Sequence, residues 1–149
     1  MKDNVKEEIE KKKEYLRGYR RHERRISRIE AELEEIKMMK LRPSMNHSGM
    51  PRGQKQYDLS DYMIKIDERE NELRLAEEAE IRTYRDIMSR IEGMAEEDER
   101  DVLFYRYIKG MEFWEIAQQM DYSERQIHRK HGKALTNLIL PEDVSSCHS

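Results

Sequence analysis

In residues 2–41, apolar side chains recur at steps of about three and four residues, the spacing of a helix that buries one narrow stripe. The spacing holds if Lys12 and Glu23 occupy two positions of the stripe, and its phase slips near Ile26. No proline interrupts the segment. We therefore predict a coiled-coil-like helix that covers most of these residues. Its apolar stripe comprises Val5, Ile9, Leu16, Tyr19, Ile26, Ile29, Leu33 and Ile36.

A second long helix is predicted from Asp58 or Ser60, the two candidate N-caps, to about Gly93. Between the two helices, residues 42–57 hold two of the three prolines and two glycines, so we interpret them as a connector. Its segment Ser48–Gly53 (SGMPRG) is either a plain linker or a structured contact loop. The apolar stripe of the second helix comprises Leu59, Met63, Ile66, Leu73, Ala76, Tyr84, Ile87, Ile91 and Met94.

The two long segments carry opposite charge. Residues 10–28 hold nine Lys or Arg against three Glu, whereas residues 58–99 hold fifteen Asp or Glu against six Lys or Arg. We favour the interpretation that the two helices pack antiparallel and neutralise each other. The alternative is that the basic segment contacts a polyanion.

The remaining chain predicts shorter elements. These are a helix over residues 97–108, a turn at 109–111, a helix over 112–120, a turn at 121–123 and a helix from Arg125 to Leu138. Pro141 ends the last helix, and the polar tail 141–149 is expected to be disordered. The predicted fold is all-α: a long antiparallel helical hairpin over residues 1–96, which we expect to oligomerise, and a small three-helix domain over residues 97–140.

Two short helices joined by a three-residue turn are typical of a helix-turn-helix, whose second helix enters the major groove of DNA. Ser123 is the expected N-cap of that helix, and the small side chain of Ala117 permits close helix crossing. With Ile127 facing inward, the first two turns present charged side chains outward. We predict base-edge contacts by Glu124, Arg125, His128 and Arg129, backbone contacts by Ser123, Gln126, Lys130 and Lys133, and a small core of Ile116, Met120, Ile127 and Leu135. The alternative for this pattern is an ordinary three-helix bundle with a solvated charged face.

The composition of the chain excludes several classes of protein. The chain has 149 residues, of which 41% are charged and 36% hydrophobic, too polar for one large shared core. No apolar run is long enough to span a membrane, and the first residues lack the apolar centre of a leader peptide. The lone Cys147 excludes a disulfide framework and indicates a cytoplasmic protein. Neither a metal-ligand spacing nor a catalytic constellation occurs, so we expect no enzyme, metal or cofactor.

The segment SERQIHRKHGKAL, residues 123–135, resembles the recognition helix of region four in sigma-70-type factors. Ser123, Ile127 and the closing Lys133-Ala134-Leu135 carry the resemblance, and Trp114-Glu115-Ile116-Ala117 resembles the preceding helix. Glu124 and Arg125 reverse the order usual in that family, and His128 replaces an Arg. We therefore expect a DNA sequence preference different from that of the family.

Residues 98–138, together with Ser48–Gly53, look closer still to small phage and prophage regulators of the ArpU and RinA type. This resemblance implies a DNA-binding activator of late packaging and morphogenesis genes in a bacterial host cell. We expect it to be a dimer, because a single helix-turn-helix usually binds DNA weakly. The resemblance to sigma region four implies a contact with RNA polymerase, for which Phe113 and Trp114 are candidates, although we favour a packing role for both. The alternatives are a non-catalytic helical adaptor that binds RNA polymerase or another protein, and a small terminase-like packaging protein.

Overall fold

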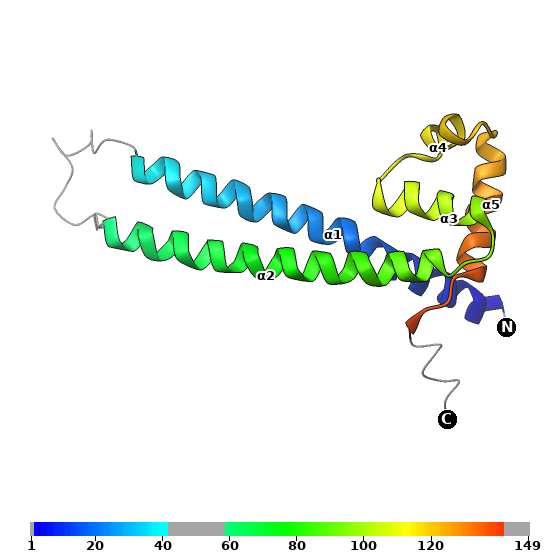
Figure 1. Ribbon diagram of the computed structural model, residues 1–149, viewed down its shortest axis with the longest axis horizontal. Coiled ribbons are helices and arrows are strands. Elements are labelled where there is room, and N and C mark those ends of the chain that lie inside the picture. The colour runs from blue at the N-terminus through cyan, green and yellow to red at the C-terminus, as the bar shows by residue number, and fades with distance from the viewer. Residues whose placement is uncertain (1, 42–58, 142–149) are drawn as a thin grey trace, which may run out of the picture. The chain divides into compact units, whose positions relative to one another are not determined.

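The computed structural model describes residues 2–41 and 59–141, and all regular structure within these ranges is helical. Two long helices come first, and a π-helical turn, η1, directly continues the first of three short helices (Figure 1). The predicted all-α fold, a hairpin followed by a helix-turn-helix domain, is confirmed. The elements are α1 (Lys2–Leu41), α2 (Leu59–Glu92), α3 (Glu97–Leu103), η1 (Phe104–Ile108), α4 (Phe113–Met120) and α5 (Glu124–Asn137).

The chain forms two compact units. The hairpin unit is His22–Ala79, and the helix-turn-helix unit comprises the described residues of Met1–Arg21 and Glu80–Ser149. Each unit therefore contains part of α1 and part of α2. None of the described helices combines the length and apolar composition needed to cross a membrane.

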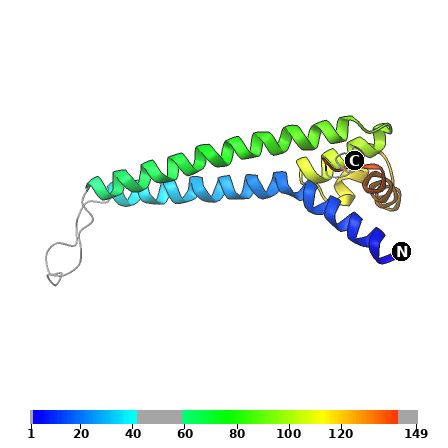
Figure 2. The same ribbon diagram turned by 90° about the horizontal axis from the view of Figure 1, so that it is seen from below.

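Within the hairpin unit, α1 and α2 run antiparallel along a narrow apolar seam (Figure 2). Its buried side chains are Ile29, Leu33, Ile66 and Ala76, with Ile26, Ile36 and Leu73 packed beside them. Ion pairs cross the seam at the surface, including Arg25–Glu72 at 3.8 Å and Arg69–Glu32 at 3.5 Å. Arg25–Glu72 has the sense that the charge interpretation expects, a base of α1 against an acid of α2, whereas Arg69–Glu32 has the reverse sense.

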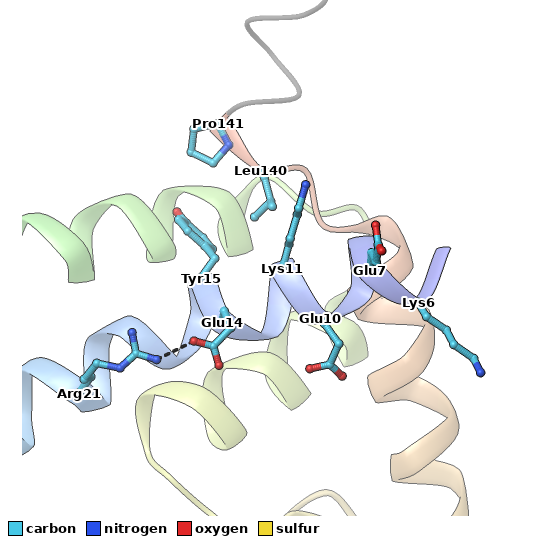
Figure 3. A pocket seen from close by; sticks show the side chains of 9 residues that line it. All are labelled: Lys6, Glu7, Glu10, Lys11, Glu14, Tyr15, Arg21, Leu140 and Pro141. Carbon is cyan, nitrogen blue, oxygen red and sulfur yellow. Dashed lines mark hydrogen bonds and ion pairs between the residues drawn. The ribbon is translucent and has the colours of Figure 1, made fainter. Parts of the chain in front are cut away.

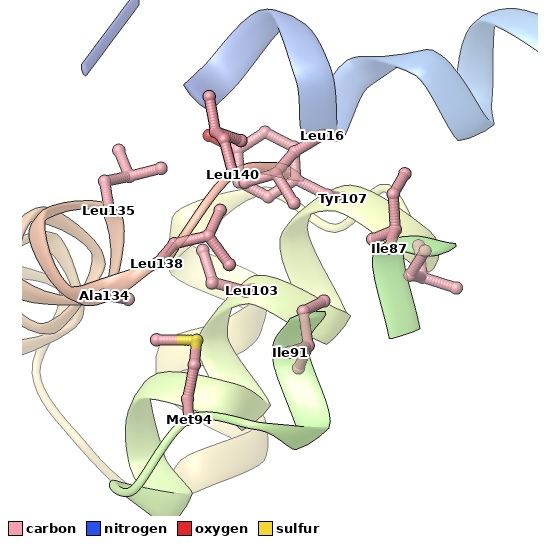
Figure 4. Close-up of a cluster of buried hydrophobic side chains, with 11 residues drawn as sticks. Leu16, Ile87, Ile91, Met94, Leu103, Tyr107, Ala134, Leu135, Leu138 and Leu140 are labelled. Atoms are coloured by element: carbon pink, nitrogen blue, oxygen red, sulfur yellow. The ribbon is translucent and has the colours of Figure 1, made fainter. Parts of the chain in front are cut away.

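The helix-turn-helix unit has a larger core, to which α1, α2, α3, η1, α5 and the residues that directly follow α5 contribute (Figure 4). A second cluster beneath the motif contains Val102, Ile116, Ala117 and Ile127. Leu135 belongs to the larger core, so its predicted place beneath the motif is wrong; Met120 does pack there, partly buried. The larger core comprises Leu16, Ile87, Ile91, Met94, Leu103, Tyr107, Ile108, Ala134, Leu135, Leu138 and Leu140.

The single helix predicted over residues 97–108 is wrong in its second half, where η1 replaces the α-helix. The amide of Lys109 donates to the carbonyl of Phe104, five residues back, at 3.1 Å. An α-helix would turn the pair 107–108 well away from the pair 102–103, because five residues are not close to a whole number of its turns. The wider π-helical turn brings both apolar pairs to the buried side, where all four side chains are less than a tenth exposed.

The turn predicted at residues 109–111 is confirmed, and Gly110 is the residue that permits it. Its φ of +69° lies in the left-handed region, where any residue with a Cβ is strained. The Arg20 guanidinium also lies directly over Gly110, in the space that a Cβ would occupy. The backbone conformation therefore requires glycine, whereas the Arg20 guanidinium, at the end of a flexible side chain, could move away from a Cβ.

The start of α2 and the end of α5 differ from the predicted helix boundaries. Since α2 begins at Leu59, Ser60 lies inside the helix and is not its N-cap. The helix α5 ends at Asn137, one residue earlier than predicted. Asp58, the connector 42–57 with its segment Ser48–Gly53, and the tail residues 142–149 with Cys147 lie outside the described residues.

Candidate nucleic-acid interface

The start of α5 is fixed by reciprocal hydrogen bonds. The Ser123 hydroxyl accepts from the amide of Gln126 at 3.2 Å, and the Gln126 side chain accepts from the amide of Ser123 at 2.9 Å. This capping box confirms Ser123 as the N-cap. Asp121, with φ of 57°, closes α4 in the left-handed conformation, and the amide of Tyr122 donates to Ala117 at 3.0 Å. The turn between α4 and α5 is thus specified locally.

The outward face of α5 carries all four residues predicted to read bases. Ile127 is fully buried, whereas Glu124, Arg125, His128 and Arg129 are exposed. Arg125 and Arg129 are one helical turn apart, and neither forms an ion pair with another described residue. Both guanidinium groups therefore remain available to an external acceptor.

Glu124 and His128 are less independent than the sequence suggests. The His128 Nε2 lies 3.6 Å from the Glu124 carboxylate, and the His128 ring packs on Phe113 with ring centroids 4.2 Å apart. A base contact by either residue would have to open or share this pair.

The predicted backbone-contact residues are placed differently from one another. Ser123 and Gln126 serve the capping box, yet the Ser123 hydroxyl hydrogen and the Gln126 amide hydrogens remain as donors. Lys130 lies 2.9 Å from the Asp98 carboxylate and 4.6 Å from the centre of the Tyr122 ring. Lys133 is exposed and forms no ion pair with another described residue.

A groove of about 540 Å³ runs between the start of α3 and one flank of α5. Its α3 side carries Glu96, Asp98 and Glu99. The Tyr122 hydroxyl donates to Asp98 at 2.6 Å, and this bond, followed by the bond from Lys130, lowers the pKa of Asp98. The flank of α5 that faces α3 therefore borders a fixed negative charge. The groove is lined by these acids together with Tyr122, Gln126, Arg129, Lys130 and Lys133.

Three buried polar side chains hold α5 in place, each through a different neighbouring element. From α1, Lys12 donates its Nζ to the carbonyl of Thr136 at 3.1 Å. From α3, the Glu99 carboxylate accepts two hydrogen bonds from Asn137, at 2.9 and 3.2 Å. In α5 itself, His131 Nε2 shares a 2.8 Å hydrogen bond with the hydroxyl of Tyr107 in η1. These contacts fix both the rotation of α5 and its position along its axis.

Sequence reasoning identified none of these polar contacts. The one signal was Lys12, which had to be accepted at a position of the apolar stripe. His131 lies one helical turn after the buried Ile127, so helix spacing puts it on the buried side. The sequence alone did not show this, because an exposed histidine would fit the charged helix equally well. Burial is the main reason that the pKa of His131 falls to about 4. Histidine is consequently neutral here at pH 7.

Residues 96–138 match the family model described as Sigma-70, region 4. These residues form a sigma-70 region 4-like helix-turn-helix. Such a domain is of a DNA-binding, non-catalytic type, and no enzyme family is indicated for the chain. No curated protein and no solved structure matches the chain.

The region 4-like domain places its two adjacent aromatic residues in different surroundings. Phe113 is half-buried, between the His128 ring and the Arg106 guanidinium, which lies 4.3 Å from the Phe113 ring centre. Trp114, by contrast, is 54% exposed. The predicted packing role is therefore correct for Phe113 and wrong for Trp114.

Proposed function

We propose that this protein is a sequence-specific transcription regulator that binds double-stranded DNA with α5 in the major groove. The observation that carries the proposal is the capped α5 of a region 4-like motif, which presents Arg125 and Arg129 without partners among the described residues. Arginines on the first turns of a recognition helix are in the position from which base edges are read.

Each predicted contact then has a chemical role. Arg125 and Arg129 offer paired donors to guanine O6 and N7, and Glu124 accepts from cytosine N4. His128 adds a donor beside them and keeps Glu124 oriented. Lys133, exposed further along α5, contacts phosphate.

The remaining predicted contacts to the DNA backbone are those of Ser123, Gln126 and Lys130. Ser123 and Gln126 donate to phosphate from the start of α5, where the helix dipole also favours an anion. Lys130 contributes less than Lys133, because Asp98 already neutralises its charge.

We further propose that the long helices of residues 1–96 dimerise the protein and that residues 97–140 bind one half-site each. A two-fold dimer would recognise half-sites one helical turn of DNA, or a multiple of it, apart. By the resemblance to ArpU and RinA regulators, the targets are late phage genes and the effect is activation.

One observation favours a second candidate, a helical adaptor that binds RNA polymerase. Trp114 exposes a large aromatic surface on α4, and such residues are enriched at the centres of protein interfaces. In the activator, the same residue would contact polymerase while α5 holds DNA.

The test is selection of bound fragments from a random DNA pool at about 150 mM salt. The parent is compared with Arg125→Ala/Arg129→Ala and with the control Arg82→Ala/Arg85→Ala, which removes the same charge from exposed positions of α2. We expect one motif from the parent and the control, and none from the α5 variant. Each lost base contact should cost ~1–3 kcal/mol. Equal enrichment by all three proteins would contradict base reading, and no enrichment by any would leave the adaptor as the better proposal.

A further inference from the structure

We propose that the first part of α1 is a second DNA-contact element, in which Lys6, Lys13 and Arg17 hold the phosphate backbone beside the groove that α5 enters. The proposal rests on the proposed function and adds a site to it. DNA binding would then use two helices that are more than a hundred residues apart in the sequence.

The three bases share one face of α1. They are separated by seven and four residues, spacings that return to the same side of an α-helix, and Arg20 follows three residues later. The side chain of Lys13 is 28% exposed and that of Arg17 is 48% exposed. The row is therefore accessible to a large anion.

The position of the row is fixed by its neighbours. Lys12 is buried and bonds the carbonyl of Thr136, which places this part of α1 against the last turn of α5. Arg20 lies over Gly110, at the turn between η1 and α4. The row therefore borders the α4 side of the helix-turn-helix, and the charges of Lys13 and Arg17 act on the buried His131 of α5.

The two flanks of α5 consequently differ in charge. On the α3 flank, the acids Glu96, Asp98 and Glu99 line the groove together with Arg129, Lys130 and Lys133, so the charges there balance. On the other side of α5, α1 adds the three cations Lys6, Lys13 and Arg17. A duplex that lies over α5 would thus be held more closely along the α1 side.

Two of the three bases already have acidic neighbours. Lys13 lies 3.3 Å from Glu10, and Arg17 lies 2.9 Å from Glu14. Both pairs are on the surface, within one helix and in contact with water, so their attraction is weak and screened by salt. A phosphate strand can therefore compete for the two cations, against the repulsion of Glu10 and Glu14 on the same face of α1.

The test compares salt dependence of binding to the DNA selected above, or to a mixed-sequence duplex, between about 75 and 300 mM salt. The variant is Lys13→Gln/Arg17→Gln, and Lys6→Gln/Lys13→Gln serves as a second variant that leaves the Arg17–Glu14 pair intact. The control is Lys11→Gln, which removes a cation from the opposite side of α1; Figure 3 shows Lys11 pointing away from Lys6.

We expect each double variant to flatten the slope of log K against log salt by about 2, because each lost phosphate contact removes about 0.9. The preferred DNA sequence should stay unchanged. Lys11→Gln should leave the slope almost unchanged, because the proposal gives Lys11 no phosphate contact. Circular dichroism confirms that the variants are helical.

Slopes equal to that of the control, with the parent bound to DNA, would overturn the second contact element while leaving the proposed function intact. A parent that binds no DNA would overturn both proposals.

Discussion

The two units of the chain are stabilised in different ways. The helix-turn-helix unit buries eleven hydrophobic side chains in one cluster and four in a second, and it contains all three buried polar side chains of the described residues. The hairpin unit buries only four, along one seam. A narrow seam suffices to pair two helices, but a recognition helix needs contacts from several directions to keep one orientation.

The outer faces of the hairpin unit keep apolar side chains that the seam does not use. Met38, Ile64 and Leu75 are each more than half exposed. Side chains of this kind are suited to a second copy of the hairpin, in line with the proposed dimer.

The largest difference between the units should come from one matched substitution in each core. Ile87→Ala and Ile29→Ala both truncate an isoleucine with no exposed surface. We expect Ile87→Ala to lower the free energy of unfolding by ~4 kcal/mol and Ile29→Ala by ~2 kcal/mol, because two helices can close over a cavity more easily than five elements can. Urea unfolding, with hydrogen exchange to follow each unit, measures both. Equal losses would mean that the seam is as rigidly packed as the larger core.

Acid should weaken the helix-turn-helix unit alone, through His131. Its pKa is about 4 in the folded chain and near 6.5 when unfolded, so the unfolded state binds the proton first. The free energy of unfolding is therefore highest above pH 6.5 and falls as the pH drops toward 4. At pH 5 it should be ~2 kcal/mol smaller than at neutral pH. The measurement is the unfolding free energy of the parent and of His131→Gln at several pH values. Parallel curves for the two proteins would contradict the assignment.

A smaller effect, of opposite sign, is expected from Gly132→Ala in α5, which should stabilise the fold. A Cβ at this position meets no atom within 4 Å, so the fold itself does not require glycine. Alanine should raise the free energy of unfolding by ~0.5–1 kcal/mol, since glycine is a poor residue for a helix interior. Thermal unfolding of the two proteins provides the comparison, and a destabilised variant would reveal a constraint on this turn of α5.

The smallest effect should be that of a surface ion pair in the hairpin unit. Arg25 and Glu72 lie 3.8 Å apart with half and a third of their side chains exposed. A double-mutant cycle with Arg25→Ala and Glu72→Ala should give a coupling below ~0.5 kcal/mol, which disappears at high salt. A coupling several times larger would show that the charges, and not the apolar seam, hold the hairpin together.

The parts of the fold that were predicted correctly depend on neighbours in the sequence. Helix periodicity, the turn between α4 and α5 and the Ser123 cap all involve residues within about one helical turn of each other. The same is true of the exposed face of α5, since burial of Ile127 determines by helix geometry that Arg125 and Arg129 point outward. The incorrect predictions for Leu135, Trp114 and residues 104–108 concern whether and where a side chain is buried in the folded chain.

The sequence by itself therefore determined the number and order of the helices, the turn of the motif and the charged face of α5. The tertiary structure decided which polar side chains are buried and what they hold. Lys12 and Thr136 are 124 residues apart, and no local pattern indicates that the ammonium group of one caps the end of the helix that contains the other. The orientation of α5 and the acidic or basic character of its two flanks depend on such contacts, because they are set by helices that meet only when the chain folds.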